Sequence, residues 1–207
     1  MQKKSWPNFN KNLISKVSKI LSSGEINYSN GPYGEKFEKE FSKFVGNGYS
    51  VAICNGTAAL EVAIKSLQLP KNSEIIVTAR SFFSSAACIV NTGHIPIFSD
   101  VNLLTQNISL GDIKKKISKR TKAIICVHLA GLSCNMNDIK KLANKNKIKI
   151  IEDCSQAHGA SINNKQVGSF GDVSTWSFCN DKIISTLGEG GMISTNKKKI
   201  YDFCKVY

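Results

Sequence analysis

The chain has 207 residues, of which 42% are hydrophobic and 21% charged, a balance typical of a folded globular protein. Its apolar runs, such as 123–132, are shorter than the ~20 residues that span a bilayer, and no signal-peptide core follows the start, so we expect a soluble cytoplasmic protein without a membrane partner. The net charge of +13 makes a nucleic-acid-binding α/β protein one alternative. The lysines, however, concentrate in segments whose apolar residues recur at helical spacing. This pattern indicates solvated faces of amphipathic helices, so we expect no nucleic-acid partner.

Three helices are predicted in the first third of the chain. Residues 8–23 carry apolar side chains on one face and stop at Gly24, and a turn-rich segment follows. Residues 34–45 and 57–68 also have apolar residues at helical spacing. The first helix is therefore separated from the others by a loop.

Seven apolar runs predict β-strands, at 50–55, 74–79, 95–100, 123–129, 147–153, 173–178 and 191–195. Most are continuous, as in strands that are covered on both faces, and they alternate with helices. This predicts an α/β fold with a mainly parallel seven-stranded sheet and flanking helices. The glycines of 188–191 permit a tight turn, so the last strand would return antiparallel. The sheet would belong to one large domain at 34–207, after an N-terminal helix and linking loop at 1–33.

The seven cysteines are scattered and form no C-x-x-C pair. Most lie within apolar runs, which indicates small buried side chains in a reducing compartment. A metal site could draw on Cys126, His128, Cys154 and His158, but no two of them have the spacing typical of zinc ligands, and we expect no metal.

Ligands of such a sheet bind beyond the carboxyl ends of the strands, so the residues at the strand exits are the candidate site. Gly56 and Thr57 lead from the first strand into a helix, whose N-terminus could bind an anion or could simply be capped by Thr57. The chain lacks the G-x-G-x-x-G motif of dinucleotide-binding folds and the P-loop motif of nucleotide-binding folds.

Aromatic and acidic side chains follow the second and fifth strands. Phe82 and Phe83 come directly after the second strand; one could stack on a planar ring, and core packing is at least as good an explanation for Phe83. Asp153 ends the fifth strand, where a buried carboxylate needs a partner such as a protonated pyridine nitrogen, a helix end or an arginine. Gln156 and His158 follow on the same loop, and a single histidine is more often structural than catalytic.

The sixth strand is followed by a lysine in an unusual setting. Ser177 and Lys182 are five residues apart, so an irregular turn could return both to one pocket. Together the strand exits would supply an anion site, an aromatic plate, a carboxylate, a hydroxyl and a lysine. Pyridoxal phosphate (PLP) needs this set: a phosphate site, a ring stack, an acid for the pyridinium and a lysine for the Schiff base.

Longer motifs resemble a known family. The segments "NGTAALEVAI", "IIEDCSQAHGA", "VGSFGDVSTWSF" and "GEGGMIST" occur in the order found in the DegT/DnrJ/EryC1/StrS aminotransferases, the sugar aminotransferase branch of fold-type-I PLP enzymes. The resemblance covers essentially the whole chain. It implies the large domain of the aspartate aminotransferase-like fold, with the family's small C-terminal domain absent from this sequence.

The resemblance also implies roles for individual residues. Lys182 would form the internal aldimine with PLP and, once released, move a proton between the substrate carbon and the cofactor. Asp153 would keep the pyridine nitrogen protonated. Phe82 matches the ring-stacking aromatic residue, and Gln156 the position near the cofactor's phenolic oxygen. The family's phosphate-binding positions correspond to Thr57, Ala58 and Ser177.

By the same resemblance, the protein would be a homodimeric aminotransferase that converts a keto group of a nucleotide-linked sugar to an amine. Glutamate would be the amino donor, and the product would serve cell-surface polysaccharide or related amino-sugar biosynthesis. A branch of the family with histidine in place of the lysine catalyses dehydration, so Lys182 favours transamination. The chain reads "SFCNDK" where many members read "SFHPTK", a variation that a subgroup of the family shares. It also stops shortly after the last strand of the large domain, so a non-catalytic or fragmentary remnant of such an enzyme is the alternative.

Overall fold

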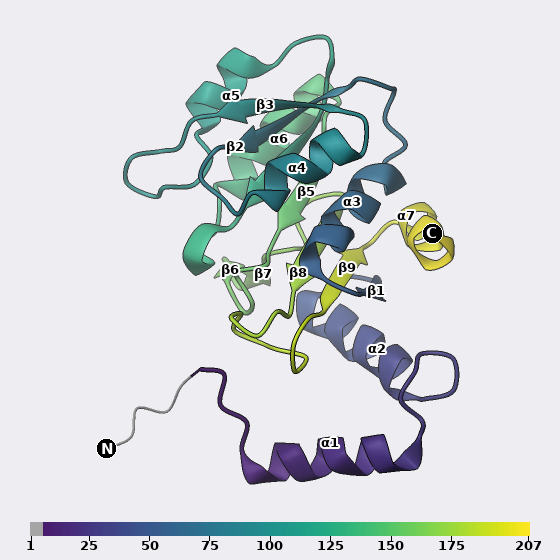
Figure 1. Cartoon of the computed structure of the whole chain (residues 1–207). Helices are drawn as coiled ribbons and strands as arrows, with labels where there is room; N and C mark the ends of the chain where they lie inside the picture. Colours follow the sequence, from purple (N-terminus) through teal and green to yellow (C-terminus); the bar gives the residue numbers. More distant parts are fainter. Residues whose placement is uncertain (1–5) are drawn as a thin grey trace.

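The computed structural model describes residues 6–207 and contains a seven-stranded sheet with helices on both faces (Figure 1). The strands lie in the order β1-β9-β8-β5-β4-β2-β3. Strand β9 is antiparallel to both of its neighbours, and the pairs from β8 to β3 are parallel. The strands are β1 Tyr49–Ile53, β2 Glu74–Thr78, β3 Ile95–Ser99, β4 Thr121–Val127, β5 Lys149–Asp153, β8 Val173–Ser177 and β9 Gly191–Thr195. The predicted α/β class, the seven strands and the antiparallel return are confirmed.

Alternate side chains of the central strands enter apolar layers on the two sides of the sheet, which explains the continuous apolar runs. Ile75 and Val77 of β2 pack on one side and Ile76 on the other. The helices on the first side are α3 Gly56–Ser66, α4 Ser84–Asn91 and α7 Lys198–Val206. Those on the second side are α2 Tyr33–Val45, α5 Leu110–Lys116 and α6 Met136–Asn146. Adjacent residues at the end of one strand therefore face opposite sides of the sheet.

Helix α1 (Lys11–Ser23) lies apart from the sheet in Figure 1 and buries no residue. Asn10 caps its start, since the side-chain oxygen accepts the amide of Leu13 at 2.9 Å, and Gly24 ends it in the left-handed conformation at φ 73°. Because the cap is at Asn10, the helix begins later than the predicted 8–23. Its apolar residues Leu13 and Leu21 are exposed.

Short elements that the sequence did not predict lie between the main strands. β6 (Ser161–Ile162) and β7 (Lys165–Gln166) form a hairpin whose two central asparagines have positive φ. After β4, a single 3-10 turn (η1, Leu129–Gly131) contains Ala130 at φ 51°. No helix within residues 6–207 combines the length and the apolar character that a bilayer crossing requires.

Candidate functional site

A cavity of about 470 Å³ lies at the carboxyl ends of β5 and β8, beside the N-termini of α3 and α4. The structure brings all of the predicted site residues except Ala58 to its wall: Thr57, Phe82, Asp153, Gln156, Ser177 and Lys182. A second cavity, of about 490 Å³, lies between α2, β1 and α7, and none of the predicted residues lines it. The chemistry expected from the sequence is therefore concentrated in the first cavity.

The N-terminus of α3 forms one wall. Asn55 caps the helix, since its Oδ1 accepts the amide of Ala58 at 2.8 Å and its carbonyl accepts the amide of Ala59 at 3.0 Å. The cap is thus Asn55 and not Thr57. The amides of Gly56 and Thr57 precede the first helical hydrogen bond and, with the helix dipole, favour an anion at this point. Ala58 does not lie on the cavity wall, so its role in phosphate binding stays a prediction.

Two glycines allow this helix end to approach the sheet. A Cβ on Gly56 would lie 2.8 Å from the Cβ of Ser177, and a Cβ on Gly191 would overlap the carbonyl oxygen of Asn55. Any other residue at either position would push the helix away from the ends of β8 and β9. The close approach sets the Ser177 hydroxyl beside the N-terminus of α3, where both can bind one anion.

Asp153 stands at the end of β5 with 5% of its surface exposed. Its Oδ2 accepts the hydroxyl of Ser85 at 3.2 Å, and its Oδ1 accepts the amide of Ser155 at 3.1 Å. The Ser85 hydroxyl is itself 2.7 Å from that of Ser81. These bonds fix the carboxylate at the cavity wall. Ser85 was missed from the sequence, where a serine in the first turn of a helix looks like a local cap.

Lys182 lies in the irregular segment between β8 and β9. Its amide donates to the carbonyl of Cys179 at 2.9 Å, and the amide of Phe178 donates to the carbonyl of Gly190 at 2.7 Å, so the segment turns back over the end of β8. The Lys182 ammonium lies 2.7 Å from the Asp181 carboxylate, and this hydrogen bond lowers the pKa of Asp181. The expected irregular turn is therefore present and returns the lysine to the cavity.

Phe82 and Gln156 complete the wall. Phe82 is 62% exposed and its ring centroid is 4.6 Å from that of Phe83, which is 70% exposed. The prediction that Phe83 packs in the core is therefore wrong. Helix α4 starts only at Ser84, and both rings lie at the cavity mouth. The Oε1 of Gln156 accepts the amide of Ala130 at 2.9 Å.

His158 packs in the aromatic core beneath the site and not on the cavity wall. Its ring centroid is 5.2 Å from that of Trp176 and 5.5 Å from that of Phe178. Burial lowers the pKa of His158 to about 4, which keeps the imidazole neutral at physiological pH. These contacts support the structural interpretation of this histidine.

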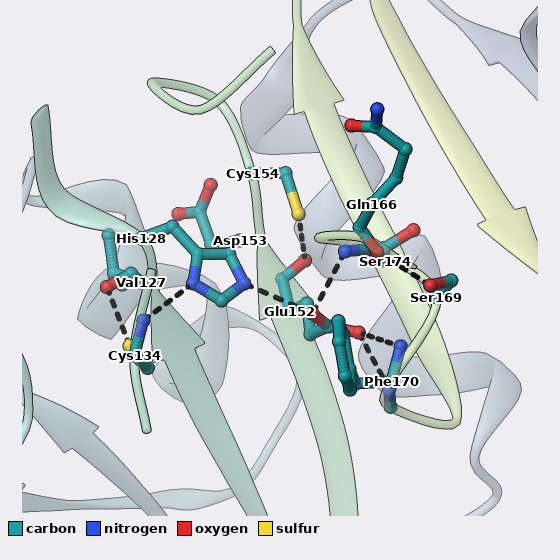
Figure 2. Close-up of polar contacts among 12 residues, drawn as sticks. Val127, His128, Cys134, Glu152, Asp153, Cys154, Gln166, Ser169, Phe170 and Ser174 are labelled. Carbon is teal, nitrogen blue, oxygen red and sulfur yellow. Dashed lines mark hydrogen bonds and ion pairs between the residues drawn. The ribbon is translucent and has the colours of Figure 1, made fainter. Parts of the chain in front are cut away.

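Glu152 is completely buried, and its side chain leaves β5 on the side opposite to that of its neighbour Asp153 (Figure 2). Its carboxylate accepts His128 Nε2 at 3.0 Å and the amides of Gly168, Phe170 and Gly171 at 2.9, 2.7 and 2.6 Å. Burial alone would raise the pKa of Glu152, but the bonds from His128 and the amides lower it overall. Glu152 therefore anchors the loop that leads into β8.

His128 connects this carboxylate to the loop after β4. Its Nδ1 accepts the amide of Cys134 at 3.0 Å, so the ring proton lies on Nε2 and is donated to Glu152. Donor atoms of His128, Glu152 and Cys154 lie within 4.8 Å of one another, as metal ligands would. The imidazole and the carboxylate are, however, already paired with each other and with the backbone, so the cluster is explained as a structural network.

Comparisons with known proteins show which family this chain resembles. The model of the DegT/DnrJ/EryC1/StrS aminotransferase family matches residues 7–207. GDP-perosamine synthase from Escherichia coli O157:H7 is 43% identical over 188 residues, which are 91% of this chain and 51% of that protein. The X-ray structure of an aminotransferase from Psychrobacter cryohalolentis has a TM-score of 0.97 and 43% identity, over 99% of this chain and 52% of that one. A structure of NtdA from Bacillus subtilis with bound cofactor PMP has a TM-score of 0.86 and 31% identity, over 92% of this chain and 42% of that one.

The chain thus spans about half the length of the curated relatives it matches. Over that half, the fold of this chain closely matches that of the solved aminotransferase. The chain belongs to the DegT/DnrJ/EryC1/StrS aminotransferase family.

Proposed function

We propose that this chain forms the cofactor-binding part of a PLP-dependent aminotransferase that converts a keto group of a nucleotide-linked sugar to an amine. The observation that carries the proposal is the gathering of Lys182, Asp153 and the α3 N-terminus around one cavity. Family membership supports the same reading. The solved relative with bound PMP supports this class of cofactor.

The groups around the cavity fit PLP in their chemistry. The N-terminus of α3 and the hydroxyls of Thr57 and Ser177 suit a phosphate, and the exposed ring of Phe82 suits a planar heterocycle. Asp153 suits a cationic ring nitrogen, and Lys182 supplies a primary amine for covalent attachment. When bound, PLP withdraws electrons from the substrate carbon that loses a proton.

Each residue then has a definite task. Lys182 would attach the cofactor and, when its amine is released, would carry the proton of the substrate carbon. Asp153, held by Ser85 and the Ser155 amide, would hold a proton on the pyridine nitrogen. Gln156, whose oxygen is already bonded to Ala130, would offer its NH₂ group to the phenolic oxygen.

The substrate and the setting are proposed from the relatives. GDP-perosamine synthase acts by its name on a nucleotide-linked sugar, which supports the same substrate class here. We propose glutamate as the amino donor, a cytoplasmic location and a role in amino-sugar biosynthesis for cell-surface polysaccharide. The alternative, a non-catalytic remnant, is distinguished by a chain that binds PLP but transfers no amino group.

Reductive labelling tests the cofactor site directly. Borohydride treatment of the chain with PLP is expected to fix a phosphopyridoxyl group on one lysine, and peptide mass mapping should locate it at Lys182. The exposed lysines of α5 and α6 act as internal controls, because none of them lines the cavity. Label spread evenly over these lysines, or missing from Lys182, would overturn the proposal.

The mouth of the cavity predicts self-association. Phe82 and Phe83 at the cavity and Ile183 and Leu187 in the segment after Lys182 are each more than half exposed, and exposed apolar side chains of this kind favour a second protein surface. The resemblance adds that the active site lies at a subunit interface, so we expect a homodimer. Light scattering at several concentrations measures this, and Phe83→Ser should shift the equilibrium toward monomer. A monodisperse wild-type monomer at every concentration would contradict the prediction.

A further inference from the structure

Asn107 uses both ends of its side-chain amide to hold a turn on a neighbouring strand exit. It lies between β3 and α5 and is 3% exposed. Its Nδ2 donates to the carbonyl of Leu132 at 2.9 Å, and its Oδ1 accepts the amide of Leu129 at 3.1 Å. Leu129 begins η1, the turn that follows β4, and Leu132 comes directly after its end. Asn107 therefore holds the two sides of this turn at once.

The held turn contains a residue in an unfavourable conformation. Ala130 has φ 51° and ψ 30°, in the left-handed region that an alanine seldom adopts. Such a conformation persists only where the surrounding contacts determine it. The bonds from Asn107 and the bond from the Leu132 amide to the Leu129 carbonyl, 3.0 Å long, are the contacts that do so.

This conformation directs the amide of Ala130 at the Oε1 of Gln156, 2.9 Å away. A carboxamide has one accepting end and one donating end. Gln156 lines the cavity, and with its oxygen committed to Ala130 its NH₂ group is the polar end that remains free for a ligand there. If the Ala130 amide turned away, the carboxamide could flip and bring an oxygen toward the cofactor's phenolic oxygen, where two acceptors would repel.

We propose that Asn107 is a positioning residue of the cofactor site, which acts through the 129–132 turn to keep the NH₂ group of Gln156 facing the cavity. Asn107 does not line the cavity itself. The proposal rests on the proposed function in so far as Gln156 contacts PLP. Its structural half, the control of the Ala130 amide by Asn107, is independent of any ligand.

A double-mutant cycle tests the part that involves PLP. Asn107→Ala and Gln156→Ala should each weaken PLP binding roughly 5–10-fold, the effect of about one hydrogen bond, as measured by visible titration. The double variant should bind no more weakly than Gln156→Ala, because Asn107 acts only through Gln156. Asn102→Ala is the matched control, since Asn102 caps a different, exposed turn of the same loop. The proposal would be overturned if the fold-losses in PLP affinity of the two single variants multiplied in the double variant. It would also be overturned if Asn107→Ala bound PLP as tightly as wild type.

Hydrogen exchange tests the part that needs no ligand. The Ala130 amide should be protected in wild type and in Asn102→Ala, and should exchange faster in Asn107→Ala and in Gln156→Ala. Asn107→Asp is a second variant, for use if Asn107→Ala fails to fold. It keeps the acceptor for Leu129 and loses the donor to Leu132, so the Ala130 amide should exchange at an intermediate rate. Unchanged protection in both Asn107 variants would overturn the inference, whereas a wild-type chain that does not bind PLP would overturn only the proposed function.

Discussion

Replacing Lys182 by alanine is expected to abolish covalent PLP binding and to lower the rate of amino transfer by about 10⁴-fold or more. Two tasks are lost together: the primary amine that attaches the cofactor, and the base that moves the substrate proton, a task that alone contributes up to about 10⁴-fold. The change should cost little stability, because within residues 6–207 the Lys182 side chain is paired with the exposed Asp181 alone. The visible absorbance of bound PLP and the rate of keto-sugar amination measure the two losses.

Lys140→Ala is the matched control for this substitution. Lys140 is exposed on α6, on the side of the sheet opposite the cavity, so its removal should leave absorbance and rate unchanged. A Lys182→Ala variant that still shows the absorbance of covalently bound PLP would contradict the assignment. A wild-type chain that binds PLP covalently but transfers no amino group would favour the non-catalytic alternative.

The sheet and most of the cavity wall could be predicted because both depend on short-range patterns. Strands buried on two faces read as continuous apolar runs, and their carboxyl ends meet at one edge of a parallel sheet. Asp153 and Ser177 could therefore be assigned to one site before their strands were known to be neighbours. The pairing of β5 with β8 then brings these two exits together.

The contacts that hold the site could not be predicted, because they depend on strand order and on backbone conformations that the sequence does not reveal. His128 meets Glu152 only because β4 pairs with β5 in the register that sets Val127 beside Asp153. Asn107 reaches Gln156 only through a left-handed alanine, which no sequence pattern indicates. Ser85 likewise resembled an ordinary helix-start residue until the structure paired it with Asp153.

Glu152→Ala is expected to lower the free energy of unfolding by about 3–5 kcal/mol, because each buried donor left without an acceptor costs about 1–3 kcal/mol and several are left at once. The substitution leaves His128 Nε2 and the three loop amides without their acceptor in a site that is closed to solvent. Glu152→Gln should lower the free energy of unfolding by less, because one side-chain oxygen remains to accept hydrogen bonds. Some loss is still expected, because its NH₂ group faces the amide donors of the loop. Urea unfolding at pH 7 measures each loss.

The difference in unfolding free energy between wild type and Glu152→Gln should depend on pH. The reason is the lowered pKa of Glu152, whose hydrogen bonds favour the ionised form. The carboxylate contributes its full stability above its unfolded pKa of about 4.3, and this contribution is lost as the pH falls through the lower folded pKa. The gap between wild type and Glu152→Gln should therefore be widest near neutral pH and should shrink below about pH 4.3. Glu40→Ala, an exposed change on α2, should stay within about 0.5 kcal/mol of wild type. A loss below about 1 kcal/mol for Glu152→Ala would mean that water reaches His128 and the loop amides, and that this network does not anchor the segment leading into β8.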